Sequence, residues 1–260
     1  DYIPIPVEEA VLDFQVVGKS TSADGAPRQE VILVAAQKTM ISMFTTAIRQ
    51  AGLKVAGVDI SSMALVRALI PQTSFLADTS EDEVCRAIAD ISSSVSTLVI
   101  AVKGALKFTR TINFSSNRFA QVLSDHLGIP GADAQGLVQQ VGLSGPAPVE
   151  EGIFSEEVIE ETRQKLAGVA AELSDEIRRS LLYYQNQPSA VPATELILSG
   201  RGALVKNLDA YMSEALNATV SIGNPLVHIA ENASKIPDDS LAFMAPYLSV
   251  AMGLALPEED

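Results

Sequence analysis

Residues 90–100 read DISSSVSTLVI, so the chain passes from one apolar segment through four serines into a second apolar segment. Apolar runs bounded by turn residues are typical of buried strands, and the short polar corner between them predicts a hairpin. Backbone N–H groups in a tight turn can hold an anion, and serine hydroxyls add further donors. The serine corner, residues 92–96, is therefore either a plain turn or a phosphate loop. Asp90 in front of it could hold a water on Mg²⁺.

The segments around this corner alternate between strand and helix patterns, which predicts a mixed α/β fold. Strands are expected over 11–17, 30–37, 53–60, 83–91, 96–102, 105–112, 193–200 and 218–223. Helices are expected over 39–50, 61–69, 116–127, 133–141, 155–185, 203–216 and 244–255. One expected strand before the corner, 83–91, and two after it, 96–102 and 105–112, are predicted to form an antiparallel meander. Two blocks that each hold strands followed by helices favour an internally duplicated fold.

A second loop of chemical interest lies at residues 196–205, LILSGRGALV. Here a predicted strand ends in Ser199, Gly200, Arg201 and Gly202, and a helix is expected from residue 203. Glycines let a ligand approach the backbone, and a helix N-terminus favours a phosphate. The G-x-G pattern is neither a Walker A loop nor a complete Rossmann fingerprint, so the loop favours a nucleotide only weakly.

Composition limits the classes of function. The chain has 260 residues, 47% of them hydrophobic, which is enough for one large domain or two small ones. Its 32 acidic residues outnumber 18 basic ones, and this balance argues against nucleic-acid binding. Cys85 is the single cysteine, which excludes a disulfide within the chain and a site built from several cysteines, and fits a reducing cytoplasm. His126 and His228 have no partner at metal-ligand spacing.

Two further features concern the chain as a whole. Its apolar runs fall well short of the roughly 18–20 residues that a membrane-spanning helix needs, so no direct membrane span is expected. The chain has no initiator Met and opens on DYIPIPVEEAVLDF, which reads like the middle of a protein. We therefore expect a fragment whose natural N-terminus is missing.

Several segments, in this order, resemble one family. They are YIPIPVEEAVLDFQVVG (2–18), the helix and strand pattern of 34–69, LILSGRGALVKNLDAYMSEALNATVSIGNPL (196–226) and APYLSVAMGLAL (245–256). Together they resemble PilM, the cytoplasmic actin-like protein family of the type IV pilus machinery. The resemblance implies an α/β, actin/DnaK-like (ribonuclease H-like) two-lobed fold with a nucleotide cleft, an inserted small subdomain and an incomplete first lobe. Residues 1–78 would hold the inserted subdomain and the remainder of the first lobe, and 79–260 the second lobe with a helical insertion.

The resemblance also assigns roles to the two loops. The family's second phosphate hairpin, D-[IV]-G-x-x-[ST]-[ST], maps onto residues 90–96. Ser92 and Ser94 stand where glycine is common, and Val95 stands where a hydroxyl residue is common. Residues with a Cβ resist the positive φ that glycine permits, so nucleotide binding is expected to be weak or lost. The loop at residues 196–205 resembles the family's adenosine-binding turn. In it Arg201 replaces a usual glycine and could stack on a base or block the pocket.

The segment DEIRRSLLYY (175–184) resembles the superfamily's adenine-facing helix, although its charges could equally be surface charges. The candidate nucleotide-binding residues are Asp90, Ser92, Ser93, Ser94, Ser96, Glu176, Arg178, Arg179, Ser199, Gly200, Arg201 and Gly202. ATP and Mg²⁺ are the implied cofactors, with Asp90 the one candidate metal residue, through a water.

What the resemblance implies for function is a scaffold of a type IV pilus, or type II secretion-like, inner-membrane platform. Its implied partners are the cytoplasmic tail of a PilN-like membrane protein, other platform proteins and a second copy in a homodimer. Its implied location is cytoplasmic and peripheral to the inner membrane. One alternative is an actin-fold ATPase, which would need a Mg²⁺ site and a positioned water. Another is an FtsA-like filament protein, but the short acidic end LALPEED is unlike a membrane-binding amphipathic tail.

Overall fold

A five-stranded sheet forms the centre of the computed structural model, which describes residues 3, 5–22, 25–70, 84–145, 155–188 and 190–257. Its strands are β3 (Cys85–Ile91), β4 (Ser96–Val102), β5 (Ala105–Ile112), β6 (Glu195–Ser199) and β7 (Thr219–Ile222). Their order in the sheet is β5-β4-β3-β6-β7. The meander β3-β4-β5 is antiparallel, as predicted, whereas β6 and β7 run parallel to β3. The carboxyl ends of β3, β6 and β7 therefore share one edge of the sheet.

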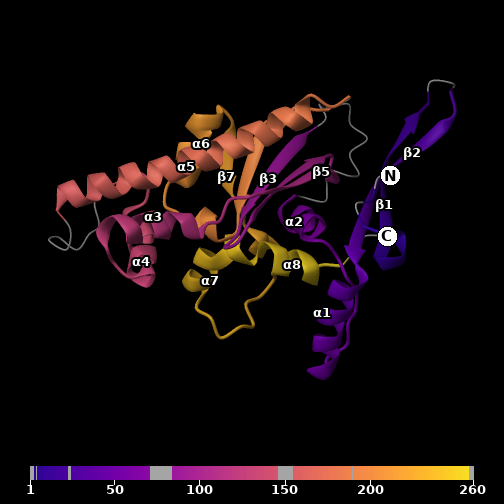
Figure 1. Ribbon diagram of the computed structural model, residues 1–260, viewed down its shortest axis with the longest axis horizontal. Helices are drawn as coiled ribbons and strands as arrows, with labels where there is room; N and C mark the ends of the chain where they lie inside the picture. Colours follow the sequence, from indigo (N-terminus) through magenta and orange to yellow (C-terminus); the bar gives the residue numbers. More distant parts are fainter. Residues whose placement is uncertain are drawn as a thin grey trace.

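Four helices pack together on one side of this sheet, two of them against its strands and two beyond its end (Figure 1). They are α3 (Asn117–Leu127), α4 (Gly131–Val141), α5 (Glu156–Gln185) and α6 (Leu208–Leu216). The 30-residue α5 begins where predicted, because the Ser155 hydroxyl accepts a hydrogen bond from the Val158 N–H at 3.3 Å. Alternate strand residues meet these helices in the larger apolar core, which includes Ala87, Ala89, Leu98, Ile100, Leu166, Leu173 and Ile177. This alternation is what a sheet covered on both faces requires.

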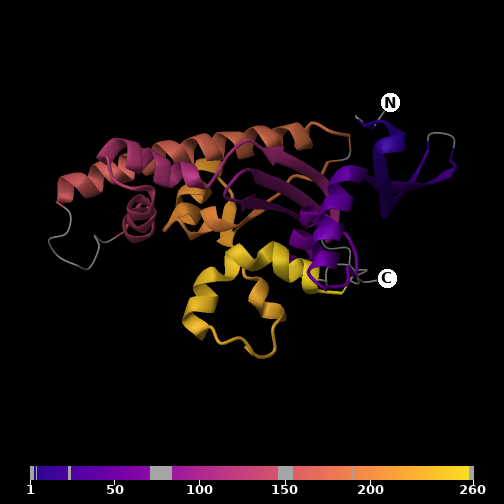
Figure 2. The same ribbon diagram turned by 60° about the horizontal axis from the view of Figure 1, so that its bottom comes forward.

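The opposite face is covered by α2 (Ser61–Leu69) and α8 (Ser249–Ala255) (Figure 2). The two helices cross closely, since a Cβ on Gly253 would lie 1.9 Å from the Ala64 carbonyl oxygen. The Arg67 guanidinium donates to the Gly253 carbonyl at 2.5 Å and to Asp59 at 2.8 Å, which ties the crossing to the segment before α2. Because α2 packs on the large sheet, only the residues before it form a separate small unit. The predicted division at residue 78 lies outside the described residues.

That small unit is a hairpin followed by one helix. It consists of β1 (Ala10–Thr21), β2 (Pro27–Gln37) and α1 (Lys38–Gln50). It lies beside β5 in both views (Figures 1 and 2). The Lys107 ammonium on β5 joins the two parts, because it contacts the Glu30 carboxylate at 2.8 Å and the Val17 carbonyl at 3.1 Å. Within the described residues up to residue 70, the chain thus forms a hairpin and helices. The predicted internal duplication is not seen there.

Short helical segments complete the described part of the chain. They are the 3-10 helices η1 (Val7–Glu9), η3 (Arg201–Leu204), η4 (Pro225–His228) and η5 (Ala245–Leu248), and the α-helix α7 (Asp238–Met244). The helix predicted over 244–255 is therefore α8 preceded by η5, because Pro246 lacks the N–H that a continuous helix needs. In the part of the chain that the structure describes, no helix combines the length and apolarity needed to cross a bilayer.

Two other predicted elements are wrong. Residues 53–60 form no strand and join neither of the two sheets of the described residues. The helix predicted over 203–216 is interrupted before α6. There the Lys206 carbonyl accepts a hydrogen bond from the Leu143 N–H at 3.0 Å, and Asn207 adopts a left-handed φ of 62°. The tertiary contact with the loop after α4 has taken the carbonyl that a helix would use.

Candidate functional site

The serine corner is the turn between β3 and β4 and lies at the carboxyl edge of the sheet. Ile91 pairs with Ser96 at its base, and none of residues 92–95 has a positive φ. The expectation that Ser92 and Ser94 conflict with a glycine conformation is therefore not met, since the corner follows a path that any residue can adopt. Ser92 is half-buried, whereas Ser93, Ser94 and Val95 are exposed at the tip. The corner thus presents its tip to solvent without backbone strain.

Asp90 joins the two loops that the sequence singled out. Asp90 as a residue is 7% exposed. Its carboxylate accepts the Ser92 hydroxyl at 2.7 Å on one oxygen and the Ser199 hydroxyl at 3.1 Å on the other. The Ser199 hydroxyl also lies 3.1 Å from the Pro246 carbonyl, an alternative acceptor. The parallel pairing of Asp90 with Ser199 brings the loops together. The carboxylate oxygens keep lone pairs, so Asp90 fits a water on Mg²⁺, but only in competition with the two hydroxyls.

The glycines of the loop after β6 serve close packing of the chain on itself. Gly200 has a φ of 77°, and a Cβ there would lie 2.8 Å from an Asp90 carboxylate oxygen. A Cβ on Gly202 would lie 2.3 Å from the Ile91 Cγ2 atom. The space that a side chain would need at Gly200 and Gly202 is thus filled by Asp90 and Ile91 at the end of β3. Arg201 between them is partly exposed, and its guanidinium has no hydrogen-bond or ion-pair partner among the described residues.

A third loop, which the sequence interpretation missed, braces the corner. The Ser93 carbonyl accepts hydrogen bonds from the Ser115 hydroxyl at 2.5 Å and from the Asn117 side-chain amide at 3.0 Å. The Ser92 carbonyl accepts the Ser116 N–H at 2.9 Å. The signal that could have identified this loop is the polar run SSN between the third meander strand and the next helix. Side-chain donors there suit carbonyls that a tight corner turns outward.

Three backbone N–H groups of the corner take no part in this brace and are free. The carbonyls of Ser92 and Ser93 point to the third loop, while the N–H groups of Ser93, Ser94 and Val95 have no acceptor within the described ranges. Successive free N–H groups at an exposed turn are the arrangement that binds phosphate oxygens. The corner therefore fits an anion chemically. The described residues contain no cluster of three or more His, Cys, Asp or Glu side chains that could hold a metal ion by themselves.

A pocket of about 530 Å³ opens beside the loop after β6. Its walls come from residues 203–207, from 222–224 at the end of β7, and from the junction of α7 and η5, with Gln139 and Asp209 added. Its volume lies in the range of small-molecule sites. The carboxyl ends of parallel strands are where α/β sheets bind ligands, so pocket and corner occupy the expected edge.

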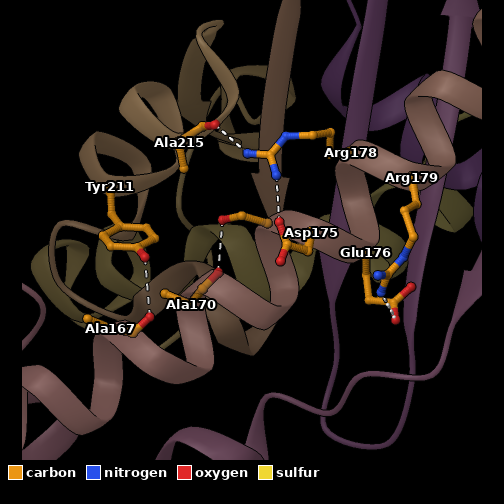
Figure 3. A network of polar contacts seen from close by, with 9 residues as sticks. Ala167, Ala170, Asp175, Glu176, Arg178, Arg179, Tyr211 and Ala215 are labelled. Atoms are coloured by element: carbon orange, nitrogen blue, oxygen red, sulfur yellow. Dashed lines mark hydrogen bonds and ion pairs between the residues drawn. The ribbon is translucent and has the colours of Figure 1, made fainter.

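The α5 candidates lie elsewhere (Figure 3). The Arg178 guanidinium contacts Asp175 at 2.5 Å and donates to the Ala215 carbonyl at 2.5 Å, while Arg179 pairs with Glu176 at 2.5 Å. Ala215 stands near the end of α6, just before β7 begins, which is the amino edge of the parallel strands. None of the three α5 candidates lines the pocket beside the turn. The structure thus brings two of the three predicted groups together, and the role of the α5 charges stays a prediction.

Comparisons with solved structures place this architecture among actin-like proteins. A chain of the PilM–PilN type IV pilus biogenesis complex matches with a TM-score of 0.75 and 22% identity, covering 98% of this chain and 68% of that chain. MreB5 of Spiroplasma citri bound to ADP matches with a TM-score of 0.59 and 16% identity, covering 85% of this chain and 65% of that one. The ethanolamine utilization protein EutJ from Carboxydothermus hydrogenoformans matches with a TM-score of 0.53 and 12% identity, at 97% and 91% coverage.

At these identities the similarity establishes the fold, and it confirms the predicted actin-like class. The sequence gives the narrower assignment, because a family model described as type IV pilus assembly protein PilM matches residues 1–259. Nearly the whole chain is covered by that match. The protein belongs to the PilM family of type IV pilus assembly proteins.

Proposed function

We propose that this chain is a scaffold of a type IV pilus, or type II secretion-like, inner-membrane platform, and that it binds the cytoplasmic tail of a PilN-like membrane protein. The observation that carries this proposal is the family match over residues 1–259. The similarity to a chain of the PilM–PilN complex supports the choice of partner. Binding to such a tail would hold the protein at the cytoplasmic side of the inner membrane, where it would meet other platform proteins.

Helix α1 offers a surface for the tail. Met40, Met43, Phe44 and Ile48 form a stripe at helical spacing, and their side chains are 39–63% exposed. No residue of α1 is buried, although apolar stripes of this kind normally pack against a partner. We call these four residues the α1 stripe. An amphipathic or extended apolar segment of a membrane protein's tail is the kind of ligand that such a stripe binds.

A pull-down with the PilN-like tail tests this docking. We expect the 260-residue chain to retain the tail and Met43→Glu to lose most of it, because a charge would have to be buried in the contact. Ser42→Glu is the matched control, since Ser42 is exposed on the same helix but lies outside the stripe. Equal retention by both variants would remove α1 from the proposal, and no retention by the unaltered chain would remove the partner.

We further propose that the carboxyl edge of the sheet binds MgATP weakly and turns it over slowly or not at all. The free N–H groups of the corner support phosphate binding, and solved actin-like relatives such as MreB5 are described as bound to ADP. Weak binding is expected because Asp90 is occupied by the Ser92 and Ser199 hydroxyls and because Ser94 adds bulk at the tip. In this proposal the backbone N–H groups of the corner bind the phosphates of the nucleotide, and the loop after β6 lies beside them at the pocket.

Calorimetry with ATP and ADP, with and without Mg²⁺, tests the cleft. The double variant Ser92→Gly, Ser94→Gly should bind at least about tenfold more tightly than the unaltered chain, because it removes the Ser92 hydroxyl from one Asp90 oxygen and opens the tip. Thr46→Gly on α1 serves as a distant control, which should leave nucleotide affinity unchanged. A turnover rate near or above about one per second in the unaltered chain, typical of phosphoryl-transfer enzymes, would show an ATPase instead of a scaffold.

A further inference from the structure

We infer that Ser115 and Asn117 are positioning residues for phosphate at the serine corner, an inference that rests on the nucleotide binding proposed above. Both stand in the third loop, between β5 and α3, and both act on the Ser93 carbonyl. That carbonyl accepts the Ser115 hydroxyl at 2.5 Å and the Asn117 side-chain amide at 3.0 Å, which uses both of its lone pairs. The Ser115 hydroxyl accepts the Asn117 N–H at 3.2 Å, so its single proton is left for the Ser93 carbonyl.

A carbonyl that is held in this way also fixes the N–H group of the next residue. The two groups belong to one planar peptide unit, and in a trans peptide they point in opposite directions. No described peptide bond is cis. Because the Ser93 carbonyl points to the third loop, the Ser94 N–H points away from it. The Ser92 carbonyl accepts the Ser116 N–H at 2.9 Å, so the Ser93 N–H is turned away from the third loop as well.

Two successive N–H groups, those of Ser93 and Ser94, therefore share one direction. The strand order β5-β4-β3-β6 places the third loop on one side of the corner and the loop after β6 on the other. Neither N–H has an acceptor among the described residues. Adjacent backbone donors of this kind form the concave arrangement that holds a phosphate oxygen. The bonds to the third loop, on the far side of the same peptide units, keep the two donors aligned.

Buried contacts hold the third loop itself in place. Phe114 and Phe119 flank its polar residues, are each 1% exposed, and pack edge to face with their ring centroids 5.9 Å apart. The Phe114 carbonyl accepts the buried Ser96 hydroxyl at 2.8 Å, which ties the loop to the first residue of β4. The side-chain donors of the loop are thus in position before a ligand binds, and such pre-organisation strengthens binding.

The ligand group that this arrangement recognises is the phosphate chain and not the nucleoside, because the two aligned donors are backbone N–H groups of the corner. Inorganic pyrophosphate therefore probes the corner without the pocket beside the loop after β6.

Nuclear magnetic resonance of the 260-residue chain with isotope-labelled serine amides, titrated with inorganic pyrophosphate at constant ionic strength, tests the inference. The Ser93 and Ser94 signals, assigned with Ser93→Ala and Ser94→Ala, should shift and saturate, because their N–H groups gain a phosphate acceptor. In the double variant Ser115→Ala, Asn117→Ala the same shifts should need about tenfold more pyrophosphate, since the peptide unit between Ser93 and Ser94 is no longer held.

Three single variants separate positioning from a general effect on the loop. Ser115→Ala should weaken pyrophosphate binding about threefold, and Ser115→Thr, which keeps the hydroxyl donor, should bind like the unaltered chain. Asn113→Ala is the matched control and should also leave binding unchanged. Asn113 is exposed in the same loop and makes no hydrogen bond to the corner within the described structure.

Ser93 and Ser94 signals that do not respond to pyrophosphate in the unaltered chain would overturn the inference, and so would a double variant that titrates like Asn113→Ala. The nucleotide proposal fails in a different way. If pyrophosphate shifts both signals and calorimetry detects no binding of ATP, the positioning role stands and the nucleotide proposal is wrong. If ATP binds equally to the unaltered chain and to the double variant, the nucleotide proposal stands and the positioning role is wrong.

Discussion

Cys85 is a buried thiol at the start of β3, in the core between the sheet and its helices. Burial raises its pKa from 9.0 to about 11, partly offset by a hydrogen bond with the Tyr184 side chain. The folded chain therefore holds the thiol proton more tightly than the unfolded chain does. A thiol in this setting is neutral at physiological pH, so Cys85 is a packing residue without redox reactivity.

This pKa shift predicts how stability depends on pH. The contribution is complete below pH 9 and is lost as the pH rises through about 11, because the unfolded chain releases the proton first. Urea unfolding should show the unaltered chain losing about 2 kcal/mol more than Cys85→Ala between these limits. The comparison with Cys85→Ala removes the shared titration of lysines and tyrosines. Parallel pH curves for the two proteins would contradict the assigned burial.

At Asp90 the limits of sequence reasoning are visible residue by residue. Asp90, Ser92 and Ser199 could be selected from sequence, because polar turns that follow apolar strands are conspicuous. That Ser199 and Asp90 touch could not be predicted without the family resemblance, because parallel pairing joins residues 109 positions apart. Ser115 and Asn117 were missed because polar residues at the start of a helix are ordinary surface composition. Their role appears only when the Ser93 carbonyl is seen between them.

At the scale of elements, the crossing of α2 and α8 depends on one small residue. Gly253→Ala would put a methyl group 1.9 Å from the Ala64 carbonyl oxygen, and backbone cannot yield as a flexible side chain would. We expect a loss of about 3 kcal/mol in the free energy of unfolding. Gly168→Ala on α5 is the control, since nothing lies within 4 Å of its added methyl group, and it should be neutral or stabilising. Denaturant unfolding measures both, and equal stabilities would show that the helices cross less closely.

Elements were predictable where one physical signal dominates. The meander strands and α5 follow from apolar periodicity and, for α5, from the Ser155 cap. The segment 53–60 has strand-like composition, but composition cannot supply a hydrogen-bonding partner. The interruption before α6 depends on the Lys206 carbonyl bonding to Leu143, a contact across 63 residues that local sequence cannot encode. Local sequence pattern therefore predicted the elements that tertiary contacts leave unchanged. It failed where a tertiary contact, or the lack of a strand partner, determined the structure.

At the scale of the molecule, three surfaces with different chemistry lie on one chain. The carboxyl edge of the large sheet carries the corner and the pocket, α1 carries an apolar stripe, and the hairpin carries an apolar face. Lys107 on β5 links the hairpin to the large sheet, and β5 is one of the three strands of the meander that forms the corner. A scaffold needs such separate surfaces, because each partner must bind without displacing the others. The proposed function, carried by the family match, uses these surfaces for binding and requires no turnover of nucleotide.

Calorimetric titration of the 260-residue chain with the cytoplasmic tail of a PilN-like protein, without nucleotide, tests the central claim most directly. The scaffold account predicts saturable one-to-one binding, weakened at least about tenfold by Met43→Glu and unchanged by Ser42→Glu. Binding should persist when MgATP is added. Absence of binding under both conditions, or binding that appears only while ATP is being hydrolysed, would contradict the account.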